Sequence, residues 1–428
     1  MSLPRYPSYK EANIGWLRSL PEHWEIAPLK RMLDIQNGAD HKAVETDHGF
    51  PVIGSGGPFA FASTPMFDGE SVLLGRKGTI DKPLYVRGPF WTVDTMYWSK
   101  IEEGTSARFA YYVATTIPFG YYSTNTALPS MTKSLLNAHL VPLPHLSEQQ
   151  VIAAFLDRET AKIDALIAEQ EKLIALLAEK RQATIAHAVT RGLEPDVPMK
   201  DSGAPCIGEV PAHWEVAPLK RFWSVTDCKH LTAEFVDDGY PLASIREVQS
   251  RYVALEEAKR TTEHFYAQLI EGDRKPMPGD LIFSRNATVG EVSQVTEEHP
   301  AFAMGQDVCL LRRLDASASP DYLQDVIRSG VVVEQLKNIM VGSTFKRVNV
   351  EEIRCLAVPM PPTGEQRRIA EFLKAERMRF EAIEQHAGRS ISLLRERRSA
   401  LITAAVTGQI DVRGTAQHDR TTPESIAA

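Results

Sequence analysis

The chain has 428 residues, of which 43% are hydrophobic and 24% charged, so its composition is that of an ordinary globular protein. This length allows about two or three domains, and no apolar run approaches the roughly 18 residues of a membrane span. The net charge of −7 argues against a protein that coats nucleic acid without selection, so any DNA binding must come from local patches.

The first residues and the cysteines favour a cytoplasmic protein. The N-terminal sequence MSLPRYPSYKEANIGW lacks the apolar core of a signal peptide. None of the cysteines forms a C-x-x-C pair, so zinc ribbons and redox motifs are poor interpretations. They lie far apart, at Cys206, Cys228, Cys309 and Cys355. We therefore expect reduced thiols, no metal site and no membrane association.

An eleven-residue segment occurs twice. Residues 21–31 read PEHWEIAPLKR and residues 211–221 read PAHWEVAPLKR, with nine identical positions. Each copy contains a tryptophan, Trp24 or Trp214, which we expect to anchor the incoming strand by packing. Internal repeats decide the fold, so this pair is the first sign of a duplicated architecture. We call the segment the framework motif.

Each framework motif opens a block with mixed α/β character. Short β-like runs alternate with Gly/Pro turns in residues 1–141 (block 1) and 201–358 (block 2). The clearest strand-like runs lie at residues 71–80, 280–290 and 307–314. Short helices are predicted at residues 106–116 and 321–338. In both blocks a strand that opens with Gly-Asp or Gly-Glu ends in a basic turn, at residues 76–79 and 285–288.

A second repeated motif follows each block. Residues 142–156 read PLPHLSEQQVIAAFL and residues 359–373 read PMPPTGEQRRIAEFL. This pair is offset by 217 residues, whereas the framework motifs are offset by 190, so block 2 is longer by 27 residues. The match continues at the same offset without a gap. The chain is therefore a tandem duplication of a variable block followed by a conserved helix.

Both conserved segments have the spacing of a coiled coil. Residues 147–190 contain no glycine or proline, and a seven-residue apolar spacing favours two helices wrapped together. The seam positions are Leu156, Ile163, Gln170, Leu177 and Thr184 in the first helix and Leu373, Phe380, Ala387, Leu394 and Leu401 in the second. Ile152, Leu166, Leu173, Ile369 and Ile383 should widen this face. Gly192 and Gly408 should end the helices.

A helix of about 43 residues would be about 65 Å long, more than a single block needs. We therefore predict an antiparallel helix pair that holds the two blocks apart, related by a pseudo-two-fold axis. The alternative is that each helix packs only on its own block. The predicted fold class is α+β: two mixed α/β domains separated by two long antiparallel coiled-coil helices. The predicted divisions are 1–145, 146–192, 193–361 and 362–410, with a disordered tail at 411–428.

The two pairs of motifs resemble the specificity subunit of type I restriction-modification systems, over about residues 10–410. The motifs that support this resemblance are P-x-H-W-E-[IV]-x-P-L-K-R at both block starts and P-x-P-x-x-x-E-Q-x-x-I-A-x-F-L at both helix starts. Segments of block 2 also look like this family: GDLIFSR at 279–285, MGQD at 304–307 and GSTFK at 342–346. Each motif alone is weak, but two copies of each in this order are specific.

The resemblance implies a non-catalytic subunit that recognises double-stranded DNA. Each block would be a target recognition domain for one half of a bipartite sequence, and the helices would set the spacing between half-sites. The helices would also dock two modification (methyltransferase) subunits, and restriction (motor-nuclease) subunits would join the complex. S-adenosylmethionine, ATP and Mg would belong to those partners, and this chain would hold no cofactor.

Candidate DNA-binding residues are the polar and basic side chains of the turns. Base edges are read mainly by Arg, Lys, Asn and Gln, while Lys and Arg also hold phosphates. The candidates are Arg76, Lys77, Thr79, Asn125, Arg246, Ser284, Arg285, Asn286, Thr288, Ser343, Thr344, Lys346 and Arg347. The alternative for each residue is an ordinary solvated turn. Candidate partner-binding residues are Glu148, Gln149, Glu365 and Gln366, for which helix capping is the alternative.

The sequence argues against two catalytic functions, those of a methyltransferase and a nuclease. An amino-methyltransferase should carry an Asn-Pro-Pro-aromatic loop, but the only Pro-Pro, at 361–362, follows Met360. A nuclease needs clustered carboxylates with a lysine, and Glu257-Ala258-Lys259 has no convincing partner. The remaining alternative is a scaffold whose duplicated α/β modules bind only protein. A preference for a split DNA sequence would distinguish the DNA-binding subunit from that scaffold.

Overall fold

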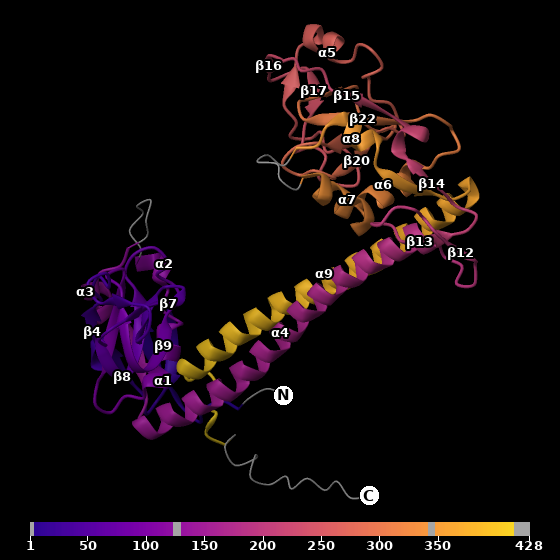
Figure 1. Cartoon of the computed structure of the whole chain (residues 1–428). Helices are drawn as coiled ribbons and strands as arrows, with labels where there is room; N and C mark the ends of the chain where they lie inside the picture. Colours follow the sequence, from indigo (N-terminus) through magenta and orange to yellow (C-terminus); the bar gives the residue numbers. More distant parts are fainter. Residues whose placement is uncertain (1–3, 123–129, 341–346, 415–428) are drawn as a thin grey trace, which may run out of the picture. The chain divides into compact units, whose positions relative to one another are not determined.

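The computed structural model describes residues 4–122, 130–340 and 347–414 (Figure 1). The chain forms two compact units. Unit 1 comprises Met1–Glu171 and Gly388–Ala428, and unit 2 comprises Lys172–Ala387. Each unit therefore contains one block, the start of the long helix that follows it and the end of the other long helix. This composition is what a pseudo-two-fold duplication predicts.

Unit 1 is built on a seven-stranded sheet with the order β4-β10-β8-β9-β6-β7-β5, antiparallel except for the pairing of β6 with β9. Its strands are β4 (Leu33–Asn37), β5 (Glu45–Thr46), β6 (Phe50–Gly54), β7 (Gly57–Ala62), β8 (Phe67–Gly75), β9 (Leu84–Thr92) and β10 (Met96–Ile101). The helices of the block are α1 (Ala107–Ala114), α2 (Phe119–Tyr122) and α3 (Lys133–Ala138).

The framework motif of unit 1 connects the block to its long helix. The hairpin β1 (Tyr9–Ile14) and β2 (Leu17–Pro21) precedes it, and β3 (Glu25–Pro28) pairs with β11 (Leu140–Leu143), the last strand before the helix. A 3-10 turn, η1 (Leu29–Arg31), then leads into the sheet. Because β3 pairs with β11, the two ends of the block are held together where the long helix begins.

Unit 2 repeats this plan with a divided sheet. The central sheet has the order β15-β22-β19-β20, and a smaller sheet has the order β16-β18-β17-β21. The strands are β15 (Trp223–Asp227), β16 (Phe235–Val236), β17 (Tyr240–Ala243), β18 (Arg260–Thr261), β19 (Leu281–Ser284), β20 (Val292–Gln294), β21 (Ala303–Met304) and β22 (Val308–Arg313). Two strand pairs around the framework motif complete the plan. β12 (Met199–Asp201) pairs with β13 (Glu209–Pro211), and β14 (Glu215–Pro218) pairs with β23 (Ala357–Met360). The turn η2 (Leu219–Arg221) follows β14.

The helices of block 2 correct one prediction. In place of a single helix over 321–338 there are two, α6 (Pro320–Arg328) and α7 (Gly330–Met340). Ser329 breaks them because its backbone is extended (ψ 154°), and its hydroxyl donates to the carbonyl of Val326 at 2.6 Å. The other helices of the block are α5 (Glu263–Leu269) and α8 (Val350–Arg354).

The two long helices are α4 (Leu146–Arg191), with 46 residues, and α9 (Thr363–Val406), with 44. Neither is apolar enough to cross a membrane, and the same holds for every other helix in the described ranges. Ion pairs show that α4 and α9 run antiparallel within each unit, because residue numbers rise along one helix as they fall along the other. In unit 1 these pairs are Asp164–Arg398 at 2.8 Å and Glu171–Arg395 at 3.1 Å. In unit 2 they are Arg181–Glu384 at 3.1 Å and, just beyond the end of α4, Glu194–Arg368 at 3.0 Å.

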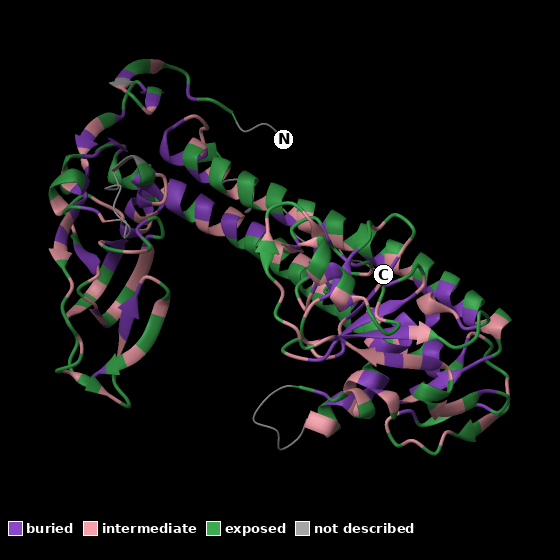
Figure 2. Ribbon diagram, turned by 90° about the horizontal axis from the view of Figure 1, so that it is seen from above, coloured by how far each residue is buried: buried purple, intermediate pink, exposed green. Residues whose placement is uncertain are grey.

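The seven-residue spacing correctly identified the packed face of the helices (Figure 2). Leu156, Ile163 and Leu177 are buried on α4, and Leu373, Phe380 and Ala387 on α9. The other predicted seam positions are only half-buried: Gln170, Thr184, Leu394 and Leu401. The residues expected to widen this face divide into two groups. Ile152 and Ile369 are fully buried in the cores of their units, but Leu166, Leu173 and Ile383 are 52%, 37% and 42% exposed. The buried seam is thus narrower than the sequence suggested.

Both long helices end at a glycine with left-handed backbone, as predicted: Gly192 (φ +75°) and Gly408 (φ +69°). A Cβ on Gly408 would lie 2.3 Å from Cδ of Pro21 and 3.2 Å from a ring carbon of Trp24. A Cβ on Gly192 would lie 3.2 Å from the ring of Trp214. In each unit the framework motif therefore packs directly on the end of a long helix.

The predicted disordered tail, 411–428, is wrong for its first residues. Val412 is fully buried, and the backbone N–H of Asp411 donates to the carbonyl of Pro4 at 2.8 Å. Arg413 lies 4.7 Å from the ring centre of Tyr6 and forms an ion pair with Asp411 at 2.7 Å. Residues 415–428 lie outside the described ranges.

Candidate nucleic-acid interface

Each unit places its basic turn at the end of a central strand, β8 in unit 1 and β19 in unit 2. The two turns are equivalent in backbone geometry. The N–H of Arg76 donates to the carbonyl of Thr95 at 2.9 Å, and the N–H of Arg285 donates to the carbonyl of Asp307 at 2.9 Å. The duplication therefore extends into the variable blocks, where the sequences of the two turns differ.

In unit 1 the turn meets a second candidate stretch. Lys77 forms an antiparallel bridge with Ser130, and the N–H of Met131 donates to the carbonyl of Arg76 at 3.0 Å. Ser130 directly follows residues 123–129, which contain the candidate Asn125 and lie outside the described ranges. The turn is thus joined to Ser130 and Met131, the described residues that directly follow this segment.

The same junction occurs in unit 2. Asn286 bridges to Arg347, and the N–H of Val348 donates to the carbonyl of Arg285 at 3.0 Å. Arg347 directly follows residues 341–346. The candidates Ser343, Thr344 and Lys346 belong to that segment and fall outside the part of the chain that the structure describes.

The exposed side chains of the unit 1 turn are Lys77 and Thr79. Arg76 is half-buried: its guanidinium donates to the carbonyl of Asp94 at 3.3 Å and lies 5.8 Å from the ring centre of Tyr97. Arg76 thus supports the turn, while Lys77 and Thr79 project from it. An exposed lysine on a tight turn suits a phosphate contact.

Two predicted DNA contacts in unit 2 are wrong in this structure because their side chains are buried. Arg285 is 3% exposed, and its guanidinium lies 2.7 Å from a carboxylate oxygen of Asp227 on β15. Ser284 is fully buried, and its hydroxyl lies 3.1 Å from the hydroxyl of Thr288. Both residues hold the turn from inside and cannot reach a base edge.

The outer surface of the unit 2 turn carries a polar cluster, which we call the unit 2 cluster: Gln249, Asn286, Thr288, Asp307 and Arg347. The amide of Asn286 donates to Asp307 at 3.3 Å, and Arg347 lies 3.5 Å from the same carboxylate. The amide of Gln249 donates to the hydroxyl of Thr288 at 2.9 Å. Gln249 was missed by the sequence analysis because it lies in the segment after β17, far from the turn in sequence.

Two residues at the unit 2 cluster have strained backbones. Ala287 has φ +55° and Asp307 has φ +64°, in the left-handed region that residues other than glycine rarely adopt. Such conformations cost about 1–3 kcal/mol each and persist where the surrounding structure imposes them, often at functional sites. The strained backbone therefore favours a functional site at this turn over an ordinary loop.

Arg246 is exposed and lines a pocket of about 510 Å³ together with Lys259 and Gln306, the chain neighbour of Asp307. Among the described residues it forms no hydrogen bond or ion pair with the unit 2 cluster, so its role in DNA binding stays a prediction.

The predicted partner-binding glutamines are internal. The side-chain carbonyl of Gln149 accepts from the N–H of Ser106 at 2.9 Å, and its amide donates to the carbonyl of Pro144 at 2.9 Å. Gln366 repeats this arrangement with the N–H of Ser319 at 2.9 Å and the carbonyl of Pro361 at 2.8 Å. Both glutamines are at most 4% exposed, so they join block to helix and do not face a partner.

The glutamates have the same kind of role. Glu148 is 8% exposed, accepts from the hydroxyl of Tyr6 at 2.8 Å and lies 2.9 Å from Nε2 of His23. Glu365, whose side chain is 11% exposed, lies 2.9 Å from Nε2 of His213. His23 and His213 both belong to the framework motif. Because Glu148, Gln149 and Gln366 are buried, the prediction that they contact a partner protein is wrong. Glu365 contacts the framework histidine of its own unit, as Glu148 does.

The duplicated framework agrees with a known protein family. A family model described as "Type I restriction modification DNA specificity domain" matches residues 21–175 and 239–386, which is more than half of the chain. The chain belongs to the type I restriction-modification specificity subunits. It is therefore a non-catalytic subunit, and DNA target recognition and assembly with modification and restriction subunits fit its family.

Two curated relatives show the extent of this similarity. The EcoBI specificity subunit of Escherichia coli is 22% identical, over 98% of this chain and 93% of that protein. The MjaVIII specificity subunit of Methanocaldococcus jannaschii is 24% identical, over 58% of each protein. The first match spans both blocks and both long helices of this specificity subunit.

Solved structures support the fold. A chain from a study titled "Structural basis underlying complex assembly and conformational transition of the type I R-M system" aligns with a TM-score of 0.68 at 15% identity, over 91% of this chain and 99% of the other. The HsdS subunit of Thermoanaerobacter tengcongensis aligns with a TM-score of 0.52 at 15% identity, over 91% and 98%. The predicted family and fold class are thus confirmed.

Proposed function

We propose that this specificity subunit recognises a bipartite DNA sequence, with each unit reading one half-site through the turn described above. The proposal rests on a turn whose backbone arrangement is repeated in both units while its side chains differ. The same backbone hydrogen bonds hold both turns, and each turn presents a threonine, Thr79 or Thr288, but unit 1 presents Lys77 where unit 2 presents Asn286. A shared backbone that presents a different side chain at this position suits the recognition of two different half-sites.

The side chains support different kinds of contact. Amides read adenine through paired hydrogen bonds, so Asn286 and Gln249 are candidate base readers. Lys77 and Arg347 are candidates for phosphate contacts, which fix the register of a protein on DNA. Asp307, which contacts both Asn286 and Arg347, would orient these side chains before DNA binds.

The long helices are the proposed docking surface for two modification subunits. Large apolar side chains stand exposed on them: Leu166 (52%) and Leu393 (64%) in unit 1, and Leu176 (51%) and Met378 (64%) in unit 2. Exposed apolar side chains that form a contiguous patch are typical of protein interfaces, and we propose that the modification subunits cover these residues. Those partners would supply the S-adenosylmethionine chemistry, and restriction subunits the ATP- and Mg-dependent chemistry. Retained copurification of the modification subunit after Leu176→Asp together with Met378→Asp would contradict this surface.

Point variants of the assembled complex test the DNA-reading proposal. Lys77→Ala should weaken binding to all sequences by roughly 5-fold and reduce the salt slope by about 1, because it removes one phosphate contact. Asn286→Ala should reduce discrimination at one position of one half-site by about 1–3 kcal/mol. Gel shifts on oligonucleotides with single substitutions at each position, at several salt concentrations, measure both effects.

The matched control is Lys100→Ala. Lys100 is an exposed residue of β10 whose partner in the sheet is Asp34 on β4, so it does not lie at the turn. It should leave affinity and salt slope unchanged. Equal effects of the Lys77 and Lys100 variants, or a uniform loss of affinity without loss of discrimination for Asn286→Ala, would count against the proposed reading turns.

A further inference from the structure

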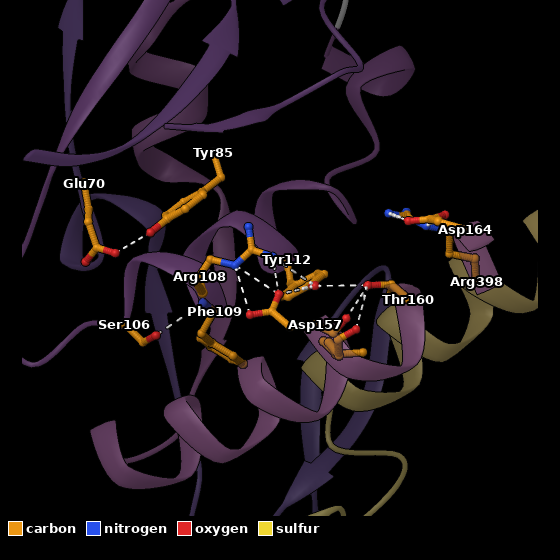
Figure 3. Close-up of polar contacts among 11 residues, drawn as sticks. Glu70, Tyr85, Ser106, Arg108, Phe109, Tyr112, Asp157, Thr160, Asp164 and Arg398 are labelled. Atoms are coloured by element: carbon orange, nitrogen blue, oxygen red, sulfur yellow. Dashed lines mark hydrogen bonds and ion pairs between the residues drawn. The ribbon is translucent and has the colours of Figure 1, made fainter. Parts of the chain in front are cut away.

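In unit 1 an ion pair fastens the block to its long helix. Arg108 on α1 contacts Asp157 on α4, with Nε 3.0 Å from Oδ1 and 3.2 Å from Oδ2 (Figure 3). The Tyr112 hydroxyl donates to the same carboxylate at 2.6 Å. Burial, reinforced by this hydrogen bond, raises the pKa of Tyr112 to about 12, so the hydroxyl is a donor at neutral pH. The Arg108 guanidinium also lies 4.6 Å from the ring centre of Tyr85.

In unit 2 the contact has the opposite charges. Asp325 on α6 is 2% exposed and accepts from Arg377 on α9 at 3.0 Å. Arg251, from the segment between β17 and β18, donates to Asp325 at 2.6 Å and to Asp321 at 2.5 Å. Across the junction between block and helix, the acid is thus on the block and the base on the helix, and Arg251 of the block also pairs with that acid. In unit 1 the base is on the block and the acid on the helix.

The two contacts lie in the same junction between block and helix, one helical turn apart, because the same hydrogen bond aligns both helix pairs. The N–H of Ser106, the N-cap of α1, donates to Gln149, and the N–H of Ser319, the N-cap of α6, donates to Gln366, each at 2.9 Å. Counted from these bonds, the correspondences are Arg108 with Asp321, Tyr112 with Asp325, Asp157 with Lys374 and Thr160 with Arg377. Lys374 lines the same cleft as Asp321 and Arg377.

We propose that this reversal of charge matches each recognition block to its own long helix, so that the blocks are not interchangeable between the two positions. A copy of block 1 placed before α9 would bring Arg108 toward Lys374 and Arg377. A copy of block 2 placed before α4 would bring Asp321 and Asp325 toward Asp157. Like charges in a half-buried contact are unfavourable, and each retains part of its desolvation cost. The inference concerns the assembly of each unit and does not depend on which DNA is read.

A charge exchange in the full chain is the first test. Arg108→Asp and Asp157→Lys, each alone, should lower the thermal midpoint of unit 1, because each places like charges together. The double variant reproduces the polarity of unit 2 and should recover at least half of the loss, the remainder reflecting the lost Tyr112 hydrogen bond. The matched control is Asp164→Lys, which breaks the more exposed ion pair between Asp164 of the same helix and Arg398 and should change the thermal midpoint only slightly. A double variant no better than the worse single variant overturns the proposal.

A duplicated block is the second test. Residues 211–360 are replaced by a copy of residues 21–143, which begins and ends at equivalent positions, so the copied Arg108 faces α9. Restoring the α4 residues in α9, with Lys374→Asp and Arg377→Thr, should raise the thermal midpoint of this chain by roughly 3 °C or more. Equal stability of the repaired and unrepaired chains, whether both fold or neither does, would show that charge does not decide placement.

Discussion

Replacing Trp214 with alanine should destabilise unit 2 by about 3–5 kcal/mol, the cost of removing a large buried aromatic side chain. Trp214 is 1% exposed and lies in the core of unit 2. Its ring packs against the end of α4 at Gly192, so it joins the framework motif to a long helix. Chemical unfolding followed by hydrogen exchange in unit 2 measures the loss.

Two variants control this prediction. Trp214→Phe keeps most of the packing and removes an indole N–H that has no hydrogen-bond partner within the described ranges, so it should cost less than half as much. Phe235→Ala, at a residue 54% exposed in the same unit, should cost under about 1 kcal/mol. A Trp214→Ala variant as stable as Phe235→Ala would contradict the assigned framework role.

Asp325→Asn should destabilise unit 2 by about 3 kcal/mol, because it removes a buried charge from between two guanidinium groups. Asp325 is 2% exposed and accepts from both Arg251 and Arg377. The asparagine has nearly the same shape, so the loss reports the charge and not the packing. Urea unfolding of the wild-type chain and the variant, at matched ionic strength, measures it.

Asp321→Asn is the control for that prediction. Asp321 also contacts Arg251, but its side chain is 48% exposed, so solvent screens the pair and the loss should stay below about 1 kcal/mol. Equal losses for the two variants would mean that burial does not set the strength of this network, and would weaken the inference drawn from it.

The repeated elements were predictable from the sequence because local patterns encode them. The seven-residue spacing identified Leu156 and Leu373 as buried, and the glycines at 192 and 408 as helix ends. The width of the buried seam was not predictable, since Leu166 is as apolar as Leu156 but is 52% exposed whereas Leu156 is fully buried. Helix periodicity indicates a face, whereas the edge of that face depends on tertiary packing.

The candidate site was predicted only in part because residue type does not reveal a distant partner. Arg285 sits in a basic turn, but its ion pair with Asp227 draws it inside. Glu148 and Gln149 are polar residues at a helix start, and their buried partners come from the framework motif and the α1 cap. Gln249 reaches the turn from a segment whose path the sequence could not give. The errors at Arg285, Glu148 and Gln249 concern long-range contacts, while the turns themselves were correctly located.

Exchange of one block provides the sharpest test that each block recognises one half-site. The chain, assembled with its modification subunits, is used to select binding sites from a random DNA library, before and after residues 222–356 are replaced by those of another family member. If each block reads one half-site, the selected motif is bipartite, and one half changes while the other half and the spacing remain the same. A change in both halves, or in neither, would contradict it.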